Sequence, residues 1–293
     1  MKISVILTAI FLLVQTIISG DTRLLFEKTL QTESGKELLV TLFTGNITIN
    51  TWSNNEVNVK FYGNDEAQDK LVFQAESTES GIKVDALKKG TKNIRNLNLK
   101  AEITVPVNYN AHLFTSGGNL TINALYGKVE ANTSGGNITA NNTTGNIEAY
   151  TSGGNVVIDN NKGNIDASTS GGNITISSFN GKVDVSTMGG HITLNGANGK
   201  IEASTAGGNI NIDYSGKNSG MDLSTMGGNI TANLPSDFDA DADIGTLAGK
   251  ITCEFADIEN KNKIINHIKT KFNSGGESFK CTTSAGNIII TKK

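Results

Sequence analysis

Six acidic residues recur along the centre of the chain at a spacing that would line up their carboxylates. Successive members are 18 residues apart, except for a last step of 20: Glu130, Glu148, Asp166, Asp184, Glu202 and Asp222. On neighbouring strands these carboxylates would form a column, although like charges placed opposite each other are destabilising. The column could bind divalent cations or a basic partner, or it could be a solvated face that discourages sheet-on-sheet aggregation. Because Ca²⁺ takes about six to eight oxygen ligands, often from loops, one column of carboxylates does not make a metal site.

Residues suited to catalysis are scarce. His112, His191 and His267 are scattered and have no Ser, Cys or metal-ligand partner at a catalytic spacing. The glycine pairs recur at expected strand corners and do not open helices, which argues against a phosphate-binding loop. A net charge of -3 also argues against a nucleic-acid binder, which would carry a basic face. We therefore expect no catalytic residues, no cofactor and no nucleic-acid partner.

The elements that would position the acidic residues are the strands of an 18-residue repeat. The string Thr-Ser-Gly-Gly-Asn, or a near variant, begins at six positions 18 residues apart: Thr115, Thr133, Thr151, Thr169, Thr187 and Thr205. Each unit divides into two halves of nine residues, such as those that open at Gly118 and Gly127. Apolar and polar residues alternate in both halves, which is the period of a strand with one buried face.

Two architectures fit such halves, a parallel solenoid and an antiparallel meander. In a meander each first half pairs with a second half, whereas in a solenoid each half stacks on its own kind. The two halves differ chemically, and each resembles its equivalent one repeat away. We therefore predict an all-β, single-stranded parallel β-solenoid (β-helix) with about 18 residues and two short strands per coil. Right-handed winding is the default for parallel crossovers, although coils this short leave the hand open.

Asparagines at equivalent corners would form a further column in this solenoid. It would contain Asn119, Asn137, Asn155, Asn173 and Asn209, with His191 substituting once. Stacked amide side chains can hydrogen-bond along such a column. The column would therefore help to hold neighbouring coils in register.

The N-terminus has the pattern of a secretory signal peptide over residues 1–20. A positive charge at Lys2 precedes an apolar stretch from Ile3 to Ile18, and small and polar residues follow. The stretch is shorter than the roughly 20 residues of a spanning helix, although an uncleaved anchor stays an alternative. We expect an exported protein, located in the periplasm, on the cell surface or in the medium, with no membrane span in the mature chain.

The mature chain is predicted to be one continuous solenoid domain. Residues 21–114 would hold N-terminal coils with insertions and a cap, 115–256 the regular repeats, and 257–293 an insertion and the C-terminal coil or cap. Within the first segment, Gly45–Ile49 and Glu56–Val59 have the pattern of one early coil with a longer corner.

Cys253 and Cys281 are the only cysteines, and the register of the repeat places both on inward positions. Export would make a disulfide between them chemically reasonable. The bridge also requires the two sheets to come within disulfide geometry, which the sequence does not establish. A disulfide and two free thiols both stay open.

Several motifs together resemble one bacterial family. They are the signal segment, the string Gly45–Ile49, the element Val105–Pro106, and tandem Thr-Ser-Gly-Gly-Asn-Ile and Gly-Lys-Val-Glu-Ala units. The combination resembles the β-strand-repeat domains of unknown function called putative adhesins, which are akin to autotransporter head domains. The resemblance covers essentially the whole mature chain. It implies a β-solenoid in an envelope or surface protein and brings no catalytic residues to carry over.

We therefore expect a non-catalytic, adhesin-like binding module of the cell envelope or surface, whose ligand is a glycan, a protein or a matrix. One alternative is a structural rod that spaces or polymerises through end-to-end stacking of coils. Another is a carbohydrate-active β-helix enzyme, which the short, uniform coils disfavour because no large loop would wall a cleft. The ligand, the mode of attachment and the oligomeric state are not determined by the sequence.

Overall fold

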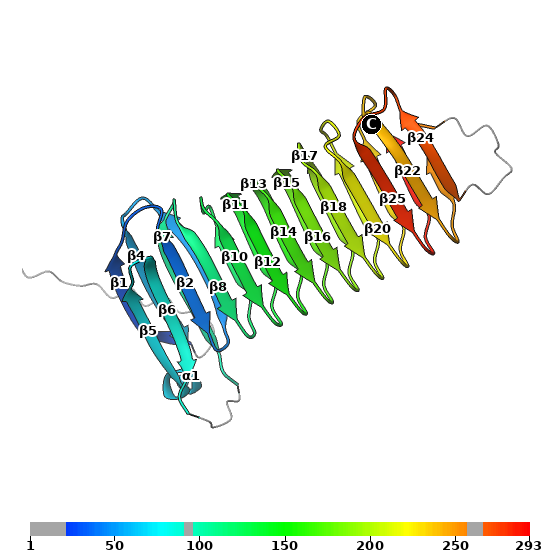
Figure 1. Ribbon diagram of the computed structural model, residues 1–293. Coiled ribbons are helices and arrows are strands. Elements are labelled where there is room, and N and C mark those ends of the chain that lie inside the picture. Colours follow the sequence, from blue (N-terminus) through cyan, green and yellow to red (C-terminus); the bar gives the residue numbers. More distant parts are fainter. Residues whose placement is uncertain (1–21, 91–95, 257–265) are drawn as a thin grey trace, which may run out of the picture.

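The chain forms a rod whose two long faces are β-sheets of 13 strands each (Figure 1). The computed structural model describes residues 22–90, 96–256 and 266–293. Strands along the centre of the rod pair in parallel, so the predicted all-β parallel solenoid is confirmed and the antiparallel meander is wrong. The predicted signal peptide, residues 1–20, lies outside the described residues. Right-handed winding stays a prediction.

The regular centre of the rod places one strand of each coil in either sheet. One sheet, called here the threonine sheet after its outward column at Thr121, contains β9 (Leu120–Asn123), β11 (Ile138–Thr144), β13 (Val156–Lys162), β15 (Ile174–Asn180), β17 (Ile192–Ala197), β19 (Ile210–Tyr214) and β21 (Ile230–Leu234). The other, called the acidic sheet after its outward carboxylates, contains β8 (Asn110–Thr115), β10 (Val129–Thr133), β12 (Ile147–Thr151), β14 (Ile165–Thr169), β16 (Val183–Thr187), β18 (Ile201–Thr205) and β20 (Met221–Thr225). Thr133 lies directly opposite Thr151, so one repeat of 18 residues is one coil.

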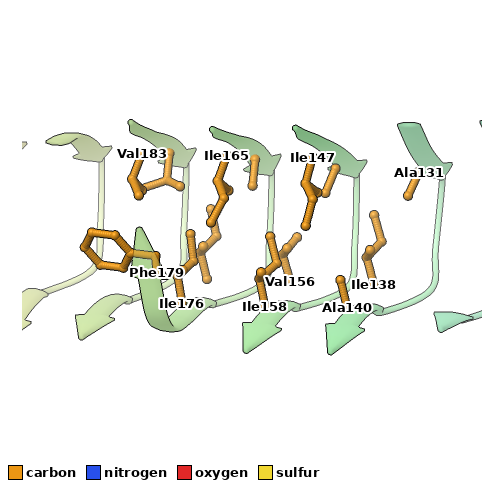
Figure 2. Packing of buried hydrophobic residues seen from close by; sticks show 14 of the residues in the cluster. Ala131, Ile138, Ala140, Ile147, Val156, Ile158, Ile165, Ile176, Phe179 and Val183 are labelled. Atoms are coloured by element: carbon orange, nitrogen blue, oxygen red, sulfur yellow. The ribbon is translucent and has the colours of Figure 1, made fainter. Parts of the chain in front are cut away.

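Aliphatic side chains from both sheets fill the narrow space between them (Figure 2). Ile138 and Ala140 of β11 and Val156 and Ile158 of β13 point toward side chains such as Ile147 of β12. All five are at most 1% exposed. Full burial of one large aliphatic side chain contributes about 1.5–3 kcal/mol. Because alanines face larger residues, aliphatic side chains fill most of this thin core, and Phe179 of β15 is a buried aromatic side chain among them.

The threonine that opens each repeat joins one coil to the coil before it. The hydroxyl of Thr151 donates to the carbonyl oxygen of Gly136 at 2.8 Å and accepts from the N–H of Gly154 at 3.3 Å. The same donation to the preceding coil recurs along the rod, from Thr133, Thr169, Thr187, Thr205, Thr225 and Thr283. These threonines are buried, so the hydroxyl satisfies corner backbone groups that water does not reach.

The corner asparagines do form a column, but their hydrogen bonds differ from the predicted amide ladder. Oδ1 of Asn119 accepts from the backbone N–H of Asn137 at 2.9 Å, and Asn137 does the same for Asn155 at 2.8 Å. The bonds run from side chain to backbone because the corner N–H needs an acceptor. His191 fits the column because its Nδ1 accepts from the N–H of Asn209 at 2.9 Å.

In the Gly-Gly pair of a corner, the stacking of coils leaves no room for a side chain at the second glycine, but it leaves room for one at the first. A Cβ on Gly136 would lie 1.8 Å from the carbonyl oxygen of Gly118 in the preceding coil. A Cβ on Gly135 would meet no atom within 4 Å. The close approach of successive backbones therefore explains one glycine, and the open corner tolerates the other.

The first coil in the sequence is not the outermost coil at the N-terminal end. β2 (Glu37–Leu42) and β3 (Asn46–Trp52) pair directly with β8 and β9. The chain between β3 and β8 then adds β6 (Gly81–Lys88) on the outer side of β2 and β7 (Leu99–Pro106) on the outer side of β3. The coil that comes later in the sequence thus lies farther out.

Antiparallel strands close this end, and they correct one prediction. They are β1 (Arg23–Gln31), β4 (Glu56–Gly63) and β5 (Leu71–Ser77). β4 lies in the threonine sheet together with β3, so the prediction that Gly45–Ile49 and Glu56–Val59 form one early coil is wrong. The short helix α1 (Asp65–Lys70) follows β4, and Oδ1 of Asn64 caps it by accepting from the N–H of Ala67 at 3.1 Å.

The C-terminal end shows the same exchange of order. β25 (Ser278–Thr283) and β26 (Ile288–Lys292) insert between the coil of β20 and β21 and the coil of β22 (Ala240–Thr246) and β23 (Ile251–Cys253). Figure 1 shows the red β25 between the yellow β20 and the orange β22. β24 (His267–Phe272) pairs antiparallel with β22 and closes the acidic sheet at this end.

Candidate binding face

The six acidic residues predicted to form a column lie opposite one another on the outer face of the acidic sheet. Glu130 is paired with Glu148, and the register continues without a shift through Asp166, Asp184, Glu202 and Asp222. Basic residues occupy the next positions at both ends of the column, His112 on β8 and Lys280 on β25. The column is therefore an acidic stretch bounded by cationic or titratable groups.

Lysines beside the column offset much of the repulsion between its carboxylates. Lys182 lies between two acids, 3.2 Å from Asp184 and 3.6 Å from Glu202, and Lys200 lies 2.5 Å from Glu202. The hydrogen bond from Lys200 and the charge of Lys182 hold the pKa of Glu202 below its usual value. These pairs are exposed, so each contributes little to stability. Within the described parts of the chain, no group of three or more His, Cys, Asp or Glu side chains is arranged to hold a metal ion.

A second outward column runs along the acidic sheet beside the carboxylates, and its chemistry changes along the rod. After Asp85 on β6 and Thr41 on β2, it contains Phe114, Asn132 and Tyr150 on β8, β10 and β12, which lie directly opposite one another. From β14 to β20 the column contains only serines: Ser168, Ser186, Ser204 and Ser224. The aromatic residues are thus confined to the N-terminal part of this face.

An open groove of about 560 Å³ follows the aromatic part of this column. Phe114, Asn132 and Tyr150 line it together with Thr41 and the serines and threonines of the adjoining corner. Every lining residue is uncharged. The groove is therefore a neutral, polar surface with an aromatic ring on either side of an amide.

A hydrogen bond that Asn132 donates to the acidic column orients its amide in this groove. Nδ2 of Asn132 donates to Oε1 of Glu130 at 3.1 Å, and Oε2 of Glu130 lies 3.0 Å from Nδ1 of His112. Tyr150 stays protonated at physiological pH, because partial burial and the nearby charge of Asp166 raise the pKa of Tyr150 to about 12. Its hydroxyl therefore keeps a proton to donate.

The outer face of the threonine sheet carries a different pair of columns. One contains Thr121, Thr139, Thr175, Thr193 and Thr231, interrupted by Val157 and Asn211. In the other, the amide of Asn141 donates to Oδ1 of Asn123 at 3.2 Å, and that of Asn123 donates to Asn50 at 3.1 Å. The amide ladder expected of stacked asparagines therefore forms on this face, where no corner N–H competes for the side-chain oxygen.

Both cysteines lie in the core as free thiols, Cys253 on β23 and Cys281 on β25. Their inward orientation agrees with the register of the repeat. Burial raises the pKa of both thiols, which keeps them protonated. The alternative of a disulfide between them stays open.

The three histidines lie on separate coils. His112 is on β8, His191 is in the corner column, and Nε2 of His267 lies 2.7 Å from Oδ1 of Asp243 at the C-terminal end.

None of the helices in the described residues has the length and apolar character needed to cross a membrane.

The groove is the feature that the sequence analysis missed. Its signal was present, because Phe114, Asn132 and Tyr150 are 18 residues apart and share one outward position of the repeat. The repeat is recognised from positions at which the same residue type recurs. The groove instead depends on Phe114 and Tyr150, which stand where the later coils have serine.

Solved structures give several distant likenesses. One is described as a putative adhesin from Bacteroides fragilis, with 13% identity, coverage of 92% of this chain and 97% of that chain, and a TM-score of 0.41. A second, a putative adhesin from Parabacteroides distasonis, has 13% identity, coverage of 93% and 98%, and a TM-score of 0.38. A third, described as a putative lipid binding protein from Parabacteroides distasonis, has 14% identity, coverage of 94% and 98%, and a TM-score of 0.29. At these TM-scores nothing about a ligand of this chain follows.

The family assignment comes from the sequence itself. None of the curated proteins matches the chain. The profile of one family, described as Toastrack DUF4097, matches residues 35–291, which are nearly the whole of the two-sheet rod. This match confirms the resemblance to the β-strand-repeat family that the tandem motifs indicated. The chain belongs to the Toastrack DUF4097 family.

Proposed function

We propose that the chain is a non-catalytic, adhesin-like binding module of the cell envelope or cell surface. The observation that carries this proposal is the flat outer face of the acidic sheet, on which side chains are aligned coil upon coil without a change of register. Solenoids use extended faces of this kind to bind extended partners. Such a face offers a row of similar contacts, which suits adhesion to a polymer or a surface.

The distribution of reactive groups supports a non-catalytic role. Catalysis needs an acid, a base or a nucleophile that converge on one reacting atom. The described histidines lie on separate coils, and the groove beside Phe114 and Tyr150 is lined by uncharged residues. In the acidic column, Glu148, Asp184 and Glu202 are paired with lysines on an open surface.

The signal-like residues 1–20 support export to the periplasm, the cell surface or the medium. This part of the proposal predicts a mature N-terminus close to Asp21. Fractionation of bacteria that produce the full chain, followed by N-terminal sequencing, tests it. Recovery of the uncleaved chain from the cytoplasm would refute export.

The capped ends argue against the alternative of a polymerising rod. End-to-end stacking needs an open parallel coil at each end, but among the described residues β1 and β5 end both sheets antiparallel at the N-terminal end, and β24 does so for the acidic sheet at the C-terminal end. Such end strands do not continue the parallel register on which the coil of another copy would stack.

Retention on surfaces tests the binding role. The exported protein is immobilised and probed with a glycan array and with collagen, fibronectin and mucin, while released products are measured. We expect saturable binding to at least one of these surfaces without turnover. Release of products from a polysaccharide would instead establish an enzyme. Concentration-dependent filaments without any surface binding would establish a scaffold.

A further inference from the structure

The acidic sheet contains two aromatic side chains that its fold does not require. At the position of Phe114 and Tyr150, the coils from β14 to β20 all have serine and stack with the same register. Both rings point outward and are partly exposed, so they add nothing to the aliphatic core. Two rings at equivalent positions, with one amide between them, therefore call for an explanation other than folding.

We propose, on the basis of the binding function above, that the groove between Phe114 and Tyr150 binds a neutral glycan chain, whose sugar rings pack on the two aromatic rings and whose hydroxyls hydrogen-bond Asn132. The proposal names the ligand class of the binding module and locates one site on its face.

The spacing of the two rings fits a chain of sugars. Phe114 is opposite Asn132, and Asn132 is opposite Tyr150, so the rings lie two strand spacings apart. Two spacings amount to about 10 Å. This is close to the length of two linked pyranose rings, so alternate sugars can meet the two aromatic faces while the hydroxyls of the sugar between them meet the amide.

The chemistry of the lining selects the class of ligand. A sugar ring has an apolar face of C–H groups, which packs on an aromatic ring, and an edge of hydroxyls that donate and accept hydrogen bonds. The groove supplies both kinds of partner, with aromatic rings at Phe114 and Tyr150 and exposed hydroxyls at Ser134 and Ser152. A peptide or a lipid would not match such a dense set of hydroxyl groups so well.

The charges around the groove select against ionic ligands. Its lining is uncharged, and Glu130, Glu148 and Asp166 run parallel to it on the next outward column. Sulfated or uronic acid chains would be repelled by these carboxylates. A cationic polymer would be drawn to the carboxylates themselves and would have no need of the aromatic pair.

The central amide is held in place before a ligand arrives. Asn132 donates one amide hydrogen to Glu130, and the carboxylate of Glu130 in turn contacts the ring of His112. The other amide hydrogen and the carbonyl oxygen of Asn132 are left for a ligand. A polar group that is already oriented costs less to immobilise on binding.

Serine replacements test the site without disturbing the fold, because serine is the residue that the neighbouring coils use. The exported protein is titrated with neutral oligosaccharides of four to six sugars chosen from an array, and with anionic ones. We expect wild type to bind at least one neutral oligosaccharide. Phe114→Ser and Tyr150→Ser should each weaken that binding by about tenfold or more, and the double variant should abolish it. Tyr126→Ala removes a 49% exposed aromatic side chain from the opposite corner and should change affinity by less than about twofold.

The outcomes separate this site from the wider binding function. The proposed glycan site would be wrong if wild type bound only anionic glycans, or if the double variant still bound the neutral oligosaccharide. If wild type binds no neutral oligosaccharide but adheres to matrix proteins as strongly as the double variant does, the binding module stands and the glycan site fails. If wild type binds neither glycans nor surfaces, both proposals fail. Circular dichroism and thermal unfolding of each variant verify that the fold is retained.

Discussion

The centre and the ends of the rod exclude water from the same core in different ways. In the centre, each coil is covered on both sides by a near copy of itself, and the core is mostly aliphatic, with Phe179 and Tyr214 as buried aromatic exceptions. At the N-terminal end, Phe26, Phe61 and Phe73 form a cluster in which the last two rings lie 4.9 Å apart. At the C-terminal end, Phe255 and Phe272 stack at 4.6 Å.

The difference follows from the number of neighbours. A coil in the middle buries its apolar side chains against two equivalent coils, so small residues fill the space. A coil at an end has one neighbour, and a large side chain is needed to cover what the missing coil would have covered. The antiparallel strands serve the backbone in the same way, because they pair the edge that the next coil would have paired.

Substituting the second glycine of a central corner should have the largest effect. In Gly136→Ala the new Cβ would overlap the carbonyl oxygen of Gly118, and neighbouring coils cannot separate without breaking their strand pairing. We expect a loss of about 3–5 kcal/mol in the free energy of unfolding, or failure to fold. Chemical denaturation measures it.

Gly135→Ala is the matched control, since its Cβ would enter open space and should change stability by less than about 0.5 kcal/mol. Equal effects at both positions would show that coil contact is not the cause.

Truncation of a core side chain should separate the two regions by its reach. Phe272→Ala at the C-terminal end and Ile165→Ala in the centre should each cost roughly 2–5 kcal/mol locally. Phe272 covers an end, so its loss should let the terminal coils open while the centre stays closed. Ile165 packs in the middle of the rod, between the coils on either side of it. Its loss should therefore lower the protection of backbone amides from hydrogen exchange on both sides.

Amide hydrogen exchange distinguishes the two patterns. Faster exchange confined to β22–β25 is expected for Phe272→Ala, and exchange spread along the rod is expected for Ile165→Ala. The comparison between centre and ends would be wrong if the two patterns coincided.

Removal of a corner hydroxyl should have an intermediate effect. Thr151→Val keeps the side-chain shape but leaves the carbonyl of Gly136 and the N–H of Gly154 without their buried partner. We expect a loss of about 1–3 kcal/mol, measured by denaturation. Ser152→Ala, at the exposed neighbouring position, should be nearly neutral. If Thr151→Val left the free energy of unfolding unchanged, the buried corner threonines would not hold the coils together.

The smallest effect should come from the charges of the acidic column. The pKa of Glu202 is held low by Lys200, so its contribution to stability is present above the unfolded pKa and is lost as the pH falls through the folded pKa. Lys200→Gln should therefore reduce stability slightly at pH 7, and the difference from wild type should be smaller at about pH 3. Denaturation at both pH values measures it, with Lys162→Gln on the threonine sheet as the control. A difference that grows in acid would contradict the assignment.

Much of the fold could be read from the repeat, and the site only in part. The spacing of Thr133 and Thr151 predicted like upon like, and the register of Glu130 on Glu148 followed from it. The strand exchange at the ends could not be predicted, because β6, β7, β25 and β26 lie outside the regular series and their places depend on long-range pairing. The groove was missed because Phe114 and Tyr150 interrupt a column rather than define one.

The sequence by itself determined the coil length, the two faces and the inward residues, including Cys253 and Cys281. These follow from local periodicity, since a strand with one buried face must alternate and a stacked coil must repeat. Only the tertiary structure decided the order of the terminal coils, the side-chain-to-backbone bonds of Asn119 and its equivalents, and the groove beside Asn132. Each of these depends on which segments become neighbours in space, and the free energy that selects neighbours is shared among residues far apart in the chain.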